Sequence, residues 1–153
     1  MEVILTVDPG KKGGWAYLRE GRVGASPLSL VGKDIDVTPI ADFFQSLKPT
    51  VYIEKVGARP GQGVCSMFTF GQGYGQLIGM CQALKWPYHL ILPQTWKKDV
   101  LMGTCKDKEA AIMVAKRLFP DINLIPKGCR KENDGMADAL CLLDYAKRRE
   151  YGR

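Results

Sequence analysis

Apolar and polar positions change their spacing several times along the chain, and each change marks a structural element. Short β-branched runs bounded by glycine or proline are typical of strands, whereas apolar residues three or four apart are typical of helices. The first half is predicted to hold strands at residues 3–7, 15–18, around 23 and 50–54, and a helix at 39–47. After a loop at 57–63, the second half is predicted to hold a long segment with Gly71, Gly75 and Gly79, a strand at 88–92, and helices at 95–101, 106–119 and 134–148.

The order of these elements predicts the fold class. Three strands joined by short turns form an antiparallel meander, and the later strands alternate with helices, which is typical of a mixed α/β sheet flanked by helices. The chain has 153 residues, of which 46% are hydrophobic and 25% charged. That size and composition suit one folded unit with its own core, so we expect a single domain over residues 1–153.

Three glycines in the long segment share a spacing of four residues. Gly71, Gly75 and Gly79 therefore lie on one face of a predicted helix, where small residues allow another backbone to approach closely. Two interpretations stay open. The face packs against the sheet of the same chain, or it forms an interface between two copies of the chain.

The formal net charge of +6 is concentrated in one segment. Between Lys85 and Lys131 there are ten Lys or Arg residues and four Asp or Glu residues, so this segment alone accounts for the whole excess. A positive balance favours a polyanionic partner, although charge by itself indicates only nonspecific affinity.

Composition also bears on the cellular compartment. No apolar run approaches the roughly 18–20 residues that span a bilayer, and no signal sequence is recognisable at the start, so neither membrane insertion nor secretion is expected. The five cysteines are scattered and never in CxxC spacing, which argues against a disulfide framework or a zinc site. A cytoplasmic protein is expected, in the host cytoplasm if the source is a phage, and a processed organelle protein stays open.

Four acidic residues stand where stability alone would not place them. Asp8 and Glu54 end two predicted strands, yet acids are depleted in strands and costly to bury without a partner. If the two strands are neighbours, their carboxylates approach within about 5 Å and repel each other unless a cation lies between them. Asp134 and Asp138 share one face of the last predicted helix. A helix cap or a dipole partner explains one such acid more readily than two.

This donor set predicts a metal site. Carboxylates without a matching His or Cys set are hard oxygen ligands that suit Mg²⁺ or Mn²⁺ better than zinc. Two such ions about 3.5–4 Å apart activate water and stabilise the leaving oxygen of a phosphodiester. Acidic metal ligands within a basic protein are typical of a nuclease, because the basic surface attracts the phosphate backbone while the metals cancel repulsion at the cut.

Five motifs occur in a characteristic order along almost the whole chain. They are Val7-Asp8-Pro9-Gly10 followed by a Gly-Trp-Ala strand, Tyr52-Ile53-Glu54, Gly71-Gln72-Gly73-Tyr74-Gly75, Thr95-Trp96-Lys97-Lys98, and Asp134-Gly135-Met136-Ala137-Asp138-Ala139-Leu140. Together they resemble the RuvC-type Holliday junction resolvases of the RNase H-like superfamily, and they look most similar to phage-encoded and chloroplast members. The resemblance implies an RNase H-like five-stranded mixed sheet, with three antiparallel strands followed by parallel ones.

The resemblance also implies an activity and a site. The expected protein is a homodimeric endonuclease that cuts four-way DNA junctions and leaves 5′-phosphate and 3′-hydroxyl ends; other branched substrates stay open. Two Mg²⁺ ions per active site are implied, with Mn²⁺ as a substitute. Their ligands would be Asp8, Glu54, Asp134 and Asp138. The bacterial pattern usually spaces its last two ligands three apart, which would place the third ligand at Gly135; Asp134 is its natural substitute here.

Further residues are expected to contact DNA. By the resemblance, Lys97 and Lys108 lie beside the metals, and Lys108 would meet the scissile phosphate or the developing charge; a solvated surface position is the alternative for either lysine. The segment 57–70 is expected to be a loop that enters the junction with Met67 or Phe68 as a wedge, unless its end simply starts the helix core. Weaker candidates for backbone contacts are Arg59, Lys98, Lys106, Lys127, Arg130 and Lys131.

Three other interpretations are left open or disfavoured. A ribonuclease H acting on RNA–DNA hybrids would use the same carboxylates. A non-catalytic module that binds branched DNA would keep the fold without cutting. An actin-like nucleotide-binding fold is disfavoured, because the chain is too short for its two lobes. His89 and the three tryptophans, Trp15, Trp86 and Trp96, are interpreted as structural residues.

Overall fold

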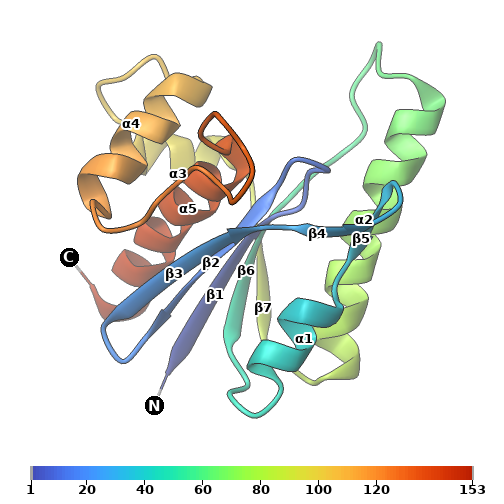
Figure 1. Cartoon of the computed structure of the whole chain (residues 1–153), viewed down its shortest axis with the longest axis horizontal. Helices are drawn as coiled ribbons and strands as arrows, with labels where there is room; N and C mark the ends of the chain where they lie inside the picture. The colour runs from blue at the N-terminus through green and yellow to red at the C-terminus, as the bar shows by residue number, and fades with distance from the viewer. Residues whose placement is uncertain (1, 153) are drawn as a thin grey trace.

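A computed structural model describes residues 2–152 and has a five-stranded sheet at its centre (Figure 1). The strand order is β3-β2-β1-β6-β7. Strands β1, β2 and β3 are antiparallel neighbours, whereas β6 and β7 run parallel to β1. The predicted mixed sheet is therefore confirmed. Its strands are β1 (Val3–Asp8), β2 (Gly14–Arg19), β3 (Arg22–Pro27), β6 (Thr50–Glu54) and β7 (Tyr88–Ile91).

Helices cover both faces of this sheet (Figure 1). One face carries α1 (Thr38–Phe44) and α2 (Val64–Ala83), and the other carries α3 (Pro93–Val100), α4 (Lys108–Leu118) and α5 (Asp134–Tyr151). The predicted helices are confirmed with end points that shift by a few residues.

Within residues 2–152, no helix is both long enough and apolar enough to cross a membrane.

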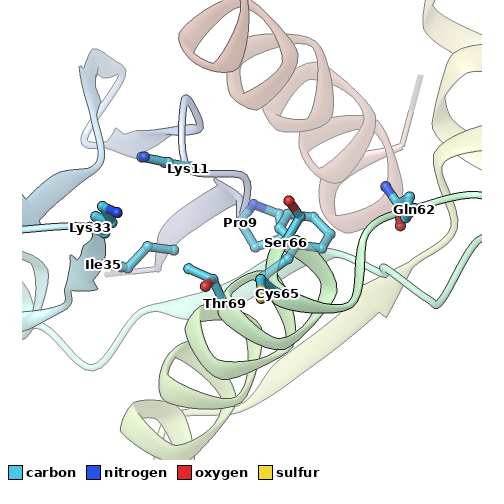
Figure 2. Close-up of a pocket in the computed structure, with 9 residues that line it drawn as sticks. Pro9, Lys11, Lys33, Ile35, Gln62, Cys65, Ser66 and Thr69 are labelled. Atoms are coloured by element: carbon cyan, nitrogen blue, oxygen red, sulfur yellow. The ribbon is translucent and has the colours of Figure 1, made fainter.

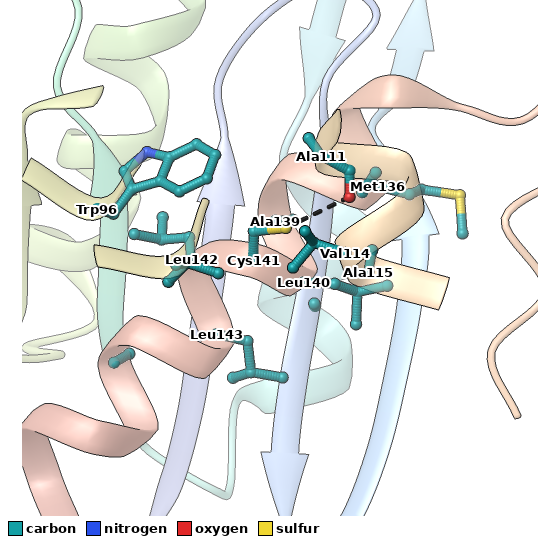
Figure 3. Close-up of a cluster of buried hydrophobic side chains, with 14 of the residues drawn as sticks. Trp96, Ala111, Val114, Ala115, Met136, Ala139, Leu140, Cys141, Leu142 and Leu143 are labelled. Carbon is teal, nitrogen blue, oxygen red and sulfur yellow. Dashed lines mark hydrogen bonds between the residues drawn. The ribbon is translucent and has the colours of Figure 1, made fainter. Parts of the chain in front are cut away.

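Two buried clusters fill the space between the sheet and its helices, because side chains alternate along each strand. Ile4 and Tyr52 belong to the cluster under α3, α4 and α5, part of which is drawn in Figure 3. Leu5 and Ile53 belong to the cluster under α1 and α2. Thr6 is also fully buried and points toward α5, where its hydroxyl donates a hydrogen bond of 2.7 Å to the carbonyl of Ala139. The register of β1 is thereby tied to α5.

A short hairpin was not predicted. It pairs β4 (Ser29–Val31) with β5 (Asp34–Asp36) on the α2 side of the sheet. All three residues of β4 are exposed, so the strand lacks the apolar alternation that marks a half-buried strand. Ile35 of β5 is 8% exposed and anchors the hairpin against α2.

The start of α2 corrects the predicted loop. The loop ends at Gly63 and the helix begins at Val64, so Met67 and Phe68 lie in the first two turns of a helix. The physical reason is local: between residues 64 and 70 there is neither glycine nor proline to interrupt a helix.

The glycine face of α2 is a second correction. Gly71, Gly75 and Gly79 do not pack against the sheet, since a Cβ added at each would meet nothing within 4 Å. Gly73 makes the close contact instead, with its Cβ position 2.6 Å from Cδ1 of Ile35. The three equally spaced glycines therefore form an outward face of α2.

Candidate active site

Two of the four predicted carboxylates lie side by side at one end of the sheet. Val7 of β1 pairs with Ile53 of β6 in parallel register, and each is followed by the acid that ends its strand, Asp8 or Glu54. Side chains alternate along a strand, so Asp8 points to the same face as Thr6, toward α5. Glu54 shares the face of Tyr52, which belongs to the α5 cluster. Both acids therefore face the N-terminal end of α5.

Close backbone packing brings α5 to this end of the sheet. Gly13 and Gly135 form an isolated β-bridge between the β1–β2 turn and the first turn of α5. A Cβ at Gly135 would lie 2.3 Å from the carbonyl oxygen of Lys12, and one at Gly14 would lie 2.6 Å from the amide nitrogen of Met136. These positions have no room for a side chain.

The same packing explains the altered spacing of the last two acids. A ligand at position 135 has no space for its side chain, whereas Asp134 is the first residue of α5 and is partly exposed. The helix is capped by Asn133, whose side-chain oxygen accepts a 2.8 Å hydrogen bond from the amide of Met136. Asp134 is therefore free of the capping role, and Asp138 follows one turn later.

The four carboxylates act on one another electrostatically. Burial raises the pKa of Asp8 to about 8, and the negative charges of Glu54, Asp138 and Asp134 contribute to the same shift. Burial raises the pKa of Asp138 to about 7, again with contributions from Glu54 and Asp134. The structure thus gathers all four predicted acids into one negatively charged cluster, called the carboxylate cluster below.

Three of these acids have one oxygen held by a donor. The Asp8 Oδ1 accepts a 3.2 Å hydrogen bond from the amide of Gly10, and the Glu54 Oε2 accepts one of 2.8 Å from the indole Nε1 of Trp96. The Lys108 Nζ lies 2.8 Å from the Asp134 Oδ2. These contacts hold the three carboxylates at the ends of β1 and β6 and at the start of α5.

The donors alter the acids unequally. Burial raises the pKa of Glu54 even though the Trp96 hydrogen bond and the charges of Lys97 and Arg59 oppose the shift. Burial also acts on Asp134, but the hydrogen bond and charge of Lys108 outweigh it and hold the pKa of Asp134 below its usual value. Asp134 is therefore the acid whose charge is best compensated.

Several predicted cations surround the cluster. Lys108 starts α4 and acts on Asp134, Asp138 and Asp8, and Lys97 of α3 acts on Glu54 and Asp138. Arg59, in the loop before α2, acts on Glu54. The structure brings these three residues together with the acids.

Two more predicted cations, Arg130 and Lys131, lie beside Asp134, together with Lys11 and Lys12, which were not predicted. A hollow of about 590 Å³ opens next to Asp134. Lys11 and Lys12 lie in the β1–β2 turn. Their position three and four residues after Asp8 is the sequence feature that could have identified them. Lys98 and Lys106 are exposed and are not among the charges that shift the pKa of the described acids. The basic residues that line the hollow are Lys11, Lys12, Arg130 and Lys131.

A second hollow, of about 480 Å³, lies between the β1–β2 turn, the β4–β5 hairpin and the start of α2 (Figure 2). Lys11 and Lys33 face it from one side, and the hydroxyls of Ser66 and Thr69 from α2. The predicted wedge residues stand nearby on the same helix, where Phe68 is 74% exposed. Cationic and hydroxyl donors therefore extend from the carboxylate cluster onto the start of α2.

The carboxylate cluster fits a hard divalent cation by its chemistry. Among residues 2–152, no three acidic, His or Cys side chains stand close enough in their present rotamers to hold a metal ion. The donors are nonetheless carboxylate oxygens alone. Burial is the main cause of the raised pKa values of Asp8 and Asp138, and the negative charges of neighbouring carboxylates add to it. A cation between them would relieve that repulsion, and oxygen-only sets suit Mg²⁺ or Mn²⁺.

Comparisons with known proteins bear on the fold. No protein-family model matches the chain. Over 95 residues, or 62% of the chain, it is 28% identical to the chloroplastic Holliday junction resolvase MOC1 of Chlamydomonas reinhardtii. The match covers 10% of that protein, so the chain spans only a small part of this curated relative's length.

Two solved structures share the architecture over nearly the whole chain. T. thermophilus RuvC in complex with a Holliday junction substrate has a TM-score of 0.65 at 13% identity, covering 99% of this chain and 98% of that one. A structure of Thermus thermophilus RuvC has a TM-score of 0.58 at 16% identity, with 96% of each chain covered. The chain therefore has a RuvC-type fold, as its sequence motifs predicted.

Proposed function

We propose that this protein is a metal-dependent, structure-selective DNA endonuclease that cuts four-way junctions. The observation that carries the proposal is the carboxylate cluster at the ends of β1 and β6 and the start of α5, on a RuvC-type fold. The partial likeness to a junction resolvase and the fold of a RuvC bound to a junction support the choice of substrate. The reaction proposed is phosphodiester hydrolysis that leaves 5′-phosphate and 3′-hydroxyl ends.

The carboxylate cluster would hold two Mg²⁺ ions, with Mn²⁺ as a substitute. We assign Asp8, Glu54, Asp134 and Asp138 as ligands because the four carboxylates act on one another electrostatically at one end of the sheet and the start of α5. Bound there, the metals would activate water and stabilise the leaving oxygen. The contribution of the chain itself is a rigid frame: two strand ends in register and a helix start fixed by backbone contact hold the four carboxylates on a common side.

Lys108 is the side chain best placed to act on the phosphate. Its side chain is 79% exposed while its Nζ reaches Asp134, so it stands at the mouth of the cluster. A cation fixed there stabilises negative charge that develops on the phosphate oxygens. Lys97 would reinforce the same field from α3.

The surrounding surface would bind the DNA backbone and the junction. The hollow beside Asp134 offers four cations to phosphates, and the start of α2 offers exposed apolar side chains to unstacked bases. We assign backbone contacts to Arg59, Lys98, Lys106, Arg130 and Lys131, and the wedge to Met67 or Phe68.

We infer that the active form is a homodimer that pairs through α2. This 20-residue helix carries no Asp, Glu, Lys or Arg, yet much of it is exposed. Its outward glycines, Gly71, Gly75 and Gly79, leave room for a second backbone. An uncharged face suits a protein partner better than DNA, and a two-fold dimer would present two active sites to the two like strands of a junction.

The dimer can be tested by placing a charge on that face. Gly75→Glu is expected to convert the protein to a monomer in analytical ultracentrifugation and to uncouple the two cuts in a plasmid-borne junction. The matched control is Met113→Glu, which introduces the same charge at a 58% exposed apolar position of α4. A Gly75→Glu protein that stays dimeric would contradict the assigned interface.

The activity can be tested on a panel of labelled substrates. Purified protein is incubated with a four-way junction, a linear duplex and an RNA–DNA hybrid, each in Mg²⁺, Mn²⁺, Ca²⁺ or EDTA, and the products are mapped. We expect paired nicks in the junction alone, with Mg²⁺ or Mn²⁺. Cleavage of the hybrid instead would indicate a ribonuclease H, and junction binding without products in any metal would indicate a non-catalytic binding module.

A further inference from the structure

One tryptophan of the buried core also contacts the carboxylate cluster. Trp96 is fully buried in the cluster under α3, α4 and α5 (Figure 3), as expected of a core residue. Its indole Nε1 nevertheless donates a 2.8 Å hydrogen bond to the Oε2 of Glu54. A buried indole N–H needs an acceptor, and here the acceptor is a charged group at the edge of the candidate site. Packing alone does not explain that pairing.

The bond fixes one oxygen of the Glu54 carboxylate, Oε2, to the indole N–H of Trp96. An indole N–H only donates, so the carboxylate oxygen is the acceptor. Because the Trp96 ring is fully buried in the core, it is a rigid partner that holds the Glu54 carboxylate in a defined orientation.

Lys97 adds a second link through the same ring. Its Nζ lies 5.3 Å from the centroid of the Trp96 ring, within the range of a cation–π contact. The charge of Lys97 acts on both Glu54 and Asp138. The Trp96 ring therefore contacts one ligand candidate by its edge and one nearby cation by its face.

We propose that Trp96 is a positioning residue of the metal site, which orients Glu54 through its indole N–H and Lys97 through its ring. The proposal rests on the proposed function, because it takes Glu54 to be a metal ligand. Groups that hydrogen-bond to metal ligands fix their orientation, and their loss typically costs about 10–100-fold in metal affinity. Trp96 would therefore strengthen metal binding without touching the metal.

The test is metal affinity measured by isothermal titration calorimetry with MnCl₂ and no DNA. Trp96→Phe keeps an aromatic ring but removes the N–H, and it is expected to weaken Mn²⁺ binding about 10-fold. Trp86→Phe is the matched control, since Trp86 is 3% exposed and lies in the other core cluster, under α1 and α2. Both substitutions shorten a buried tryptophan, so a loss of Mn²⁺ affinity confined to Trp96→Phe would point to the surroundings of Glu54 and not to general destabilisation.

An isosteric replacement separates the hydrogen bond from the packing. Benzothienylalanine at position 96 substitutes sulfur for the indole N–H at nearly constant shape, and it also covers the case in which Trp96→Phe fails to fold. We expect about the same loss of Mn²⁺ affinity as for Trp96→Phe. Wild-type affinity in the folded isosteric variant would overturn the positioning role. Absence of Mn²⁺ binding by the wild-type protein would instead overturn the metal site itself, so the two failures are distinguishable.

Discussion

The two longest helices, α2 and α5, lie on opposite faces of the sheet and use glycine in opposite ways. In α5, Gly135 is enclosed by backbone atoms of the β1–β2 turn. In α2, Gly71, Gly75 and Gly79 meet nothing. The close packing at Gly135 places the first turn of α5, with its two acids, beside the ends of β1 and β6. The glycines of α2 leave an exposed helix face instead.

The difference shows that glycine spacing alone does not reveal what a helix packs against. The regularly spaced glycines of α2 face outward. The close approach is made instead by the adjacent Gly13 and Gly14 together with Gly135, which lies far from them in sequence. Charge follows the same division: α2 is uncharged, while α5 begins with two acids of the carboxylate cluster. We therefore assign chemistry to the start of α5 and association to the outer face of α2.

Apart from the loss of a metal-ligand carboxylate, the largest effect is expected at Lys108, the cation that compensates Asp134 at the start of α5. Lys108→Ala should slow junction cleavage about 10²-fold, because a fixed charge near the scissile phosphate is lost. Junction affinity, measured by gel shift in Ca²⁺, should change little. Lys147→Ala removes an exposed lysine from the other end of α5 and serves as the control. Equal cleavage by the two variants would remove Lys108 from the site.

The enclosed glycine of α5 gives the next largest effect. Gly135→Ala should lower the free energy of unfolding by about 3 kcal/mol, because the new Cβ overlaps backbone atoms that cannot move independently. Chemical denaturation measures the change, with Gly71→Ala as the control on α2. A stability within error of wild type would show that the close approach of Gly13 and Gly135 is not needed to fix α5.

Burial of Asp138, reinforced by repulsion from the neighbouring carboxylates, predicts a variant that is more stable without metal. Asp138→Asn should raise the free energy of unfolding in EDTA at pH 8 by on the order of 2 kcal/mol, since one pKa unit is equivalent to about 1.4 kcal/mol and residual solvent weakens the repulsion.

The sign of its pH dependence follows from the raised pKa of Asp138. Ionisation destabilises the folded state fully above about pH 7 and has no effect below the unfolded value near 4. The advantage of Asp138→Asn should therefore vanish as the pH falls to 4. Thermal melts across this range in EDTA provide the measurement, and an advantage that does not depend on pH would refute the electrostatic origin.

The smallest effect is expected on the outer face of α2. Gly75→Ala should raise protomer stability by up to about 1 kcal/mol, because alanine has the higher helix propensity and its Cβ meets no atom of the same chain. Urea denaturation is measured at a concentration where the protein is monomeric. A clear loss of stability would mean that this face packs within the protomer, and the contrast between the two helices would fail.

The sequence predicted the sheet because its strands differ from their surroundings in spacing and residue type. Strand β6 was predicted with both of its ends, since β-branched and aromatic residues lead directly to an acid. The β4–β5 hairpin was not predictable in this way, because its first strand is wholly exposed and packing acts on Ile35 alone among its apolar residues.

The four residues of the carboxylate cluster could be singled out from the sequence because each acid breaks a local rule. Asp8 and Glu54 end apolar strands, and Asp134 and Asp138 begin a buried helix, so each needed an explanation beyond stability. Trp96 breaks no such rule: a tryptophan in an apolar helix face is read as core, and its bond to a residue 42 positions away exists only in the folded chain. The outward orientation of the α2 glycines could not be predicted for the same reason: tertiary packing decides which face a helix presents to a sheet.

The most direct test of the account compares junction binding and junction cleavage in Asp8→Asn. Gel shift in Ca²⁺ measures binding, and product formation in Mg²⁺ measures cleavage, with Asp42→Asn as a control at an exposed position of α1. We expect Asp8→Asn to bind the four-way junction as the wild type does but to yield no products. The control Asp42→Asn is expected both to bind and to cleave the junction. Wild-type cleavage by Asp8→Asn would contradict the assignment of the carboxylate cluster as the active site.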